Sequence, residues 1–104
     1  MKTMTKEILA NRIYGEDAVE VLDFLETVAP DKHLFRTETT FLNFVAKKLY
    51  PLLRKEARKN KNTQNYEFWN NRAMSMDITR PINKKKNVLW CIRLLNGKCE
   101  SPKK

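Results

Sequence analysis

Hydrophobic residues recur at helical spacing through the first third of the chain. Met4, Ile8, Leu9 and Ile13 give one apolar stripe, which predicts a short helix over residues 4–13. Gly15 then interrupts the pattern, as glycine commonly does between two elements.

A second, more amphipathic helix follows. Glu16 and Asp17 are expected to open it, because carboxylates are favoured at the positive end of a helix, and Pro30 is expected to stop it. Its apolar face consists of Ala18, Val21, Leu22, Leu25 and Val28.

A third helix is predicted to begin after Thr37, whose hydroxyl suits the N-cap position. Its apolar side contains Phe41, Val45 and Leu49. Pro51 disfavours helical geometry at Tyr50, so this helix is expected to end or kink there. A last helical piece is expected from Pro51 to about residue 58, since proline suits a first helical position.

The C-terminal third changes period. Met74, Met76 and Ile78 alternate with polar residues, and Val88, Trp90, Ile92 and Leu94 recur at every second position. Period two predicts strands, so two strands around the loop at residues 79–87 form a predicted β-hairpin with a basic tip.

Three helices followed by a hairpin predict an α+β fold, the winged helix-turn-helix, in which the hairpin is the wing. The 104 residues and the 41% hydrophobic content are those of one globular domain. We therefore expect a single winged-helix domain over residues 1–97 and a short basic tail over residues 98–104.

The charge is unevenly distributed along the chain. Residues 1–35 contain four basic and seven acidic side chains, whereas residues 36–104 contain seventeen basic and five acidic ones. Such a gradient indicates a polyanionic partner, most commonly nucleic acid. The alternative is a lysine-rich surface that has no partner.

The candidate nucleic-acid-binding residues occupy the third helix, the run after it and the predicted wing tip. They are Asn43, Lys47, Lys48, Arg54, Lys55, Arg58, Lys59, Lys61, Arg72, Lys84, Lys85 and Lys86. Asn43 and Arg72 are candidates for contacts to base edges, with ordinary surface polarity as the alternative. Lysine is a point charge, so this set predicts backbone-dominated binding with weak sequence preference.

Aromatic residues lie beside the basic run at Tyr66, Phe68 and Trp69. Their spacing fits a strand that packs against the helices, and the alternative is a platform on which unpaired bases stack.

The residues do not indicate an enzyme, a metal or a cofactor. His33 is the single histidine, and Cys91 and Cys99 do not have the spacing of zinc ligands. Cys91 is expected to be a small apolar strand residue and Cys99 a tail thiol. The sequence has neither a signal peptide nor an apolar run that could span a membrane, which predicts an intracellular protein of the cytoplasm or nucleus.

The N-terminal half also resembles a known family. Residues 5–25, TKEILANRIYGEDAVEVLDFL, are similar to the opening of the winged-helix domain of the transcription factor E family, which includes the alpha subunit of the eukaryotic general factor. Lys48-Leu49-Tyr50 resembles the end of that family's third helix, and residues 64–68 resemble its aromatic strand. The resemblance implies a wing at residues 59–65 and a role at the RNA polymerase clamp during promoter opening.

The sequence therefore predicts a non-enzymatic, double-stranded DNA-binding protein that acts in transcription or its regulation, as a monomer or homodimer. RNA polymerase or another protein is a further candidate partner. The alternative is a small protein-interaction module, encoded by a virus or mobile element, that binds and inhibits a host complex.

Overall fold

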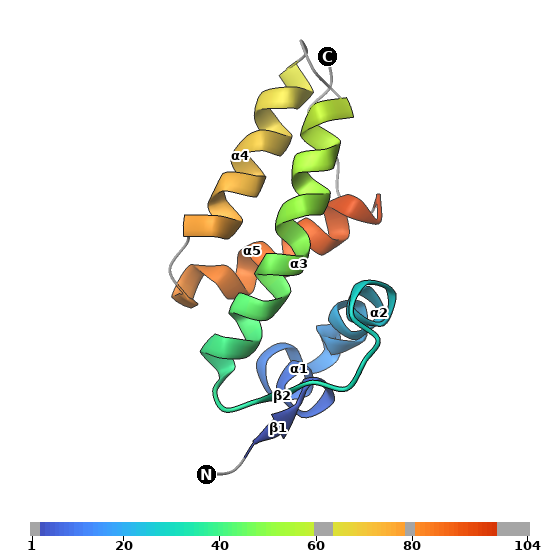
Figure 1. Cartoon of the computed structure of the whole chain (residues 1–104), viewed down its shortest axis with the longest axis vertical. Helices are drawn as coiled ribbons and strands as arrows, with labels where there is room; N and C mark the ends of the chain where they lie inside the picture. The colour runs from blue at the N-terminus through green and yellow to red at the C-terminus, as the bar shows by residue number, and fades with distance from the viewer. Residues whose placement is uncertain (1–2, 60–63, 79–80, 98–104) are drawn as a thin grey trace.

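The protein is almost entirely helical in a computed structural model that describes residues 3–59, 64–78 and 81–97 (Figure 1). Its helices are α1 (Lys6–Tyr14), α2 (Ala18–Val28), α3 (Glu38–Lys59), α4 (Gln64–Ile78) and α5 (Pro81–Leu95), with a 3-10 turn at Gly15–Asp17. Strands β1 (Met4–Thr5) and β2 (Leu34–Phe35) pair antiparallel, with Met4 opposite Phe35.

Helix α3 is the axis of the molecule, which is 48 Å long and 24 Å wide. Figure 1 shows α4 running back along α3 in the opposite direction, while α5 crosses α3 near its middle. Helices α1 and α2 and the small sheet lie at the end of the molecule where α3 begins. The buried side chains of all five helices form one hydrophobic cluster.

The structure confirms the first two predicted helices, except that Met4 lies in β1 and that Ile8, assigned to the apolar stripe, is exposed. The Thr5 hydroxyl accepts a hydrogen bond from the Ile8 backbone N–H at 3.2 Å and caps α1, and Gly15 ends α1 at a φ of +55° that favours glycine. Lys6 is almost fully buried, and its ammonium donates to the carbonyl of Ala29, which follows the last turn of α2.

Helix α3 begins as predicted but does not end at Tyr50. The Thr37 hydroxyl accepts from the Thr40 backbone N–H at 3.1 Å, which confirms the N-cap. Residues 38–59 then form one helix that contains Pro51. Pro51 is exposed, so the Lys47 carbonyl that lacks its usual N–H donor lies on the solvent side, where water can bind it.

The predicted winged helix-turn-helix fold is wrong, because α4 and α5 occupy the segments assigned to the wing. In α4, Met76 is buried and Met74 is 45% exposed, since positions two apart in a helix face nearly opposite directions. Residues 79–80 lie outside the described ranges, and residues 81–87 of the predicted loop form the first half of α5.

The predicted strand over residues 88–94 is wrong because almost every position there is apolar, so the apparent alternation carries little information. A continuous apolar run matches a period of 2 and a period of 3.6 equally well. The buried residues Val88, Cys91 and Ile92 have the i, i+3, i+4 spacing of a helix, and Pro81 is the first residue of α5. Cys91 is thus a buried helical residue and not a strand residue.

The strand implied by the family resemblance is also absent. Residues 64–68 form the start of α4, and Trp69 is buried in the core from that helix. The implied wing at residues 59–65 lies partly outside the described residues, as does the tail at residues 98–104.

Candidate nucleic-acid interface

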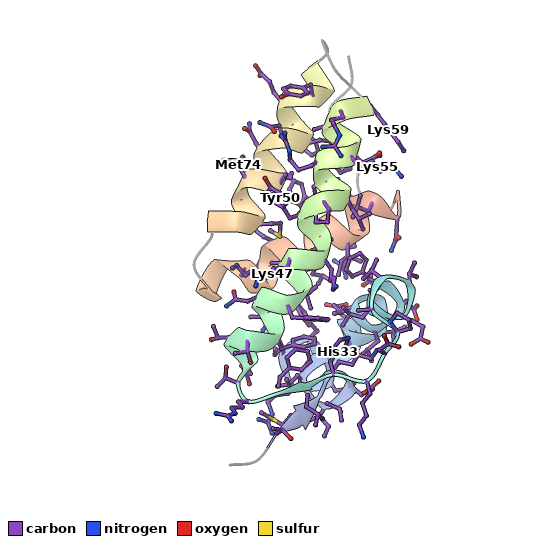
Figure 2. All side chains as sticks on the ribbon, viewed as in Figure 1. His33, Lys47, Tyr50, Lys55, Lys59 and Met74 are labelled. Atoms are coloured by element: carbon purple, nitrogen blue, oxygen red, sulfur yellow. The ribbon has the colours of Figure 1, made fainter. Side chains whose placement is uncertain are left out.

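Five basic side chains follow the solvent side of α3, and we call this surface the outer face of α3. It consists of Lys47, Lys48, Lys55, Arg58 and Lys59. Lys48 is half-buried and the other four are exposed. Figure 2 labels Lys47, Lys55 and Lys59, which lie at successive levels along the helix.

The packing of α3 explains why these cations face solvent. The opposite side of the helix is buried against the other elements through Phe41, Leu42, Val45, Ala46, Leu49, Leu53 and Ala57. Positions 47, 51, 55 and 58 are separated by three or four residues, so they share the remaining side. With a rise of about 1.5 Å per residue, the outer face extends for roughly 18 Å.

Few of these charges are neutralised within the described residues. Lys59 forms an ion pair with Glu56 at 3.2 Å, and the Lys48 ammonium lies 5.3 Å from the centre of the Phe44 ring. Lys47, Lys55 and Arg58 have no ion-pair partner in the described part of the chain. Exposed ion pairs such as Lys59–Glu56 are weak, so Lys59 remains available to an external anion.

Arg54 does not belong to this surface. It is half-buried, and its guanidinium donates a hydrogen bond to the side-chain carbonyl of Asn70 on α4. This predicted nucleic-acid contact instead joins α3 to α4.

Lys84 is likewise not at an exposed hairpin tip. Its side chain is only 8% exposed, and its ammonium donates to Asn43 Oδ1 at 2.8 Å. Asn43, a candidate base reader, is therefore engaged with α5. Lys85 and Lys86 are exposed on α5, and the Lys85 carbonyl accepts a hydrogen bond from the buried Tyr14 hydroxyl at 2.9 Å.

Arg72, the second candidate base reader, is half-buried and packs against two aromatic rings. Its guanidinium carbon lies 4.1 Å from the centre of the Trp90 ring and 5.4 Å from that of Phe68, which is cation–π geometry. Its Nε is buried without a hydrogen-bond partner among the described residues. Burial raises the pKa of the neighbouring Cys91 thiol to about 11, although the positive charge of Arg72 acts in the opposite direction.

The remaining candidates add no further chemistry to the interface. Lys61 and Cys99 lie outside the described residues. His33 packs on Phe44, with ring centres 4.6 Å apart. In the ranges that the structure describes, no three His, Cys, Asp or Glu residues are grouped to hold a metal, and no helix has the length and apolar character needed to cross a membrane.

One contact that the sequence did not indicate involves Arg93. Its guanidinium donates to both carboxylate oxygens of Glu20 and to Asp17 at distances of 2.7 to 3.2 Å. It thereby joins α5 to the acidic start of α2. No local spacing signals this contact, because the partners are more than 70 positions apart.

The outer face of α3 is thus a row of lysine and arginine side chains on one helix, and Lys55 and Lys59 also line a pocket beside α2 that contains Asp23 and Glu56. Such a row presents positive charge to an extended anion. Comparisons with protein-family models, with curated proteins and with solved structures give no match to this chain.

Proposed function

We propose that the protein binds the phosphate backbone of nucleic acid through the outer face of α3. The observation that carries this proposal is the row of exposed cations, of which Lys47, Lys55 and Arg58 lack an ion-pair partner among the described residues. Unpaired surface cations on a single helix attract a polyanion and release its counterions when they bind.

The chemistry of the outer face favours contacts to phosphates over contacts to bases. Four of its five cations are lysines, which are point charges without the bidentate geometry used to read guanine. Asn43 and Arg72 are held by Lys84 and by aromatic rings, respectively. Binding should therefore depend strongly on salt and weakly on base sequence.

The test is fluorescence anisotropy of a labelled mixed-sequence duplex, and of one of its single strands, titrated with protein at several salt concentrations. If all five cations contact phosphates, the logarithm of the duplex association constant should fall against the logarithm of salt concentration with a slope of about −4 to −5.

The informative variant reverses two charges at the centre of the outer face, Lys55→Glu with Arg58→Glu. We expect weaker duplex binding and a salt slope smaller in magnitude by about 2. The matched control, Lys32→Glu with Arg36→Glu, makes the same change in net charge at exposed positions outside α3.

Two outcomes would overturn the proposal. One is flat anisotropy at low salt from a protein whose circular dichroism shows that it is folded. The other is an equal loss of binding in both double variants, which would indicate a general effect of net charge. Either result would shift the search to an acidic protein partner.

A further inference from the structure

A pocket of about 450 Å³ opens between α3, α4 and α5, beside the outer face of α3. Its lining residues are Asn43, Ala46, Lys47, Tyr50, Met76 and Lys84. Figure 2 labels Lys47 and Tyr50, which lie one turn apart on α3. Four of the six lining side chains carry polar groups, and none of them is a carboxylate.

The buried ammonium of Lys84 is the main feature of this pocket. Its side chain is more than nine-tenths buried, and the one hydrogen-bond acceptor that it has among the described residues is the neutral Asn43 Oδ1. An ammonium has three N–H donors, and burying its charge costs free energy unless an anion or several acceptors compensate. Among the described residues that line the pocket, none carries a negative charge opposite Lys84.

Three further groups are placed to contact an anion bound there. Lys47 is exposed and supplies a second ammonium from the lining of the pocket. Asn43 accepts through Oδ1 from Lys84, which leaves its Nδ2 as a donor, and the Tyr50 hydroxyl is another donor. Lys84 also lies in the first turn of α5, where the helix dipole favours negative charge.

We infer that this pocket binds a phosphate group. Two ammonium groups match a doubly charged anion, and lysine is a common ligand of phosphate. The volume is in the range of small-molecule sites, so a phosphate that carries a nucleoside also fits. The phosphate can belong to a free nucleotide or to the end of a nucleic-acid strand. The pocket shares Lys47 with the outer face of α3, whereas Lys84 and Tyr50 are not part of that surface.

The experiment is isothermal titration calorimetry in a buffer free of phosphate and sulfate, at low ionic strength. The probes are inorganic phosphate, a nucleoside monophosphate, and a short single strand with or without a 5′-phosphate. We expect saturable binding of phosphate, and tighter binding of whichever larger probe is the natural ligand. Preference for the free nucleotide or for the phosphorylated strand distinguishes the two sources.

Lys84→Gln should weaken binding of the phosphate probes about tenfold, because it removes a charged hydrogen-bond donor. Lys85→Gln is the matched control, since Lys85 is the next residue on α5 and is exposed. It should leave phosphate affinity unchanged. If Lys84→Gln does not fold, Lys47→Gln and Tyr50→Phe test the same site at an exposed and a half-buried position.

No saturable phosphate binding by the wild type would overturn the inference. Equal affinities for the pocket variants and for Lys85→Gln would do the same, because binding would then occur elsewhere. Lys55→Glu with Arg58→Glu leaves the pocket lining unchanged, so it should weaken duplex binding and retain phosphate binding. Failure of the proposed function and failure of the pocket are therefore separately visible.

Discussion

Single side chains in this protein gain their roles from neighbours that are distant in the sequence. Arg72 on α4 places its guanidinium against Trp90 on α5, next to the fully buried Cys91. A buried thiol resists ionisation because the thiolate loses its hydration, and this raises the pKa of Cys91 to about 11. Stability at alkaline pH should consequently depend in part on Cys91, and in part on Tyr14, whose pKa burial also raises.

Cys91→Ala tests this dependence. The folded protein retains the thiol proton up to about pH 11, whereas an unfolded chain loses it near pH 9, so this contribution to stability is complete below pH 9 and declines above it. Near pH 10 the loss for the wild type should be about 1 kcal/mol larger than for the variant, relative to neutral pH. Urea denaturation at the two pH values measures the difference.

Cys99→Ser serves as the control, since it removes the other thiol. It should preserve the alkaline decline of the wild type. An identical decline in wild type and Cys91→Ala would contradict the assignment of this effect to Cys91.

At the scale of helices, Pro51 is the least expected feature. It lies inside α3 on the exposed side, and the helix continues for eight residues to Lys59. Packing of Leu53 and Ala57 in the core holds the second half of the helix in line with the first. Tertiary contacts thus outweigh the tendency of proline to interrupt a helix, although Pro51 still lowers the stability of α3.

Replacement of Pro51 by alanine should therefore stabilise the protein. Alanine restores an N–H donor for the Lys47 carbonyl, and the expected gain in the free energy of unfolding is about 1–3 kcal/mol, reduced somewhat by the greater flexibility of the unfolded chain. Chemical denaturation measures the gain. Pro30→Ala, outside any helix, should give no such increase, and a destabilised Pro51→Ala would show that proline is required in α3.

The helices also show which parts of the fold could be predicted from the sequence. The helices up to α3 were predictable because polar and apolar residues separate clearly on them, as in Ala18, Val21 and Leu25. Helix α5 was not, because the apolar run around Val88 and Trp90 is compatible with either period, and α4 was not, because Met74 and Met76 alternate with polar residues as in a strand. Local pattern alone cannot decide such a segment, whose form is set by packing against α3.

The candidate site, too, was predictable from the sequence only in part. Exposure of Lys47, Lys55 and Arg58 follows from the amphipathic pattern of α3. The hydrogen bonds of Arg54 and Lys84 could not be predicted from this pattern, since their partners lie 16 and 41 positions away in the sequence. A sequence identifies a basic residue, whereas its availability to a ligand depends on the tertiary structure.

Across the whole molecule, the acidic N-terminal part of the chain and its basic C-terminal part are connected by ion pairs. Arg93 contacts Glu20 at 2.7 Å and Asp17 at 3.1 Å, and these contacts fasten α5 to α2. Glu20 is largely buried and Arg93 is partly buried, so solvent screens the pair less than it screens the surface pair Lys59–Glu56.

A double-mutant cycle with Glu20→Gln and Arg93→Gln measures this link. We expect a coupling of about 1–2 kcal/mol, because the two single changes remove the same bidentate contact. Thermal or chemical denaturation of the four proteins gives the value. The same cycle with Glu56→Gln and Lys59→Gln should show a much smaller coupling. Additive effects at Glu20 and Arg93 would show that the contact contributes little to holding α5 against α2.

The aromatic cluster around Arg72 has a practical consequence for spectroscopy. Both tryptophans of the chain, Trp69 and Trp90, lie on α4 and α5, so selectively excited tryptophan fluorescence reports mainly on that region, whereas α1 and α2 contain no tryptophan. Far-ultraviolet circular dichroism, in contrast, sums the signal of all five helices. The two optical signals view different parts of one hydrophobic cluster, and coincident melting curves would mean that it unfolds as a unit.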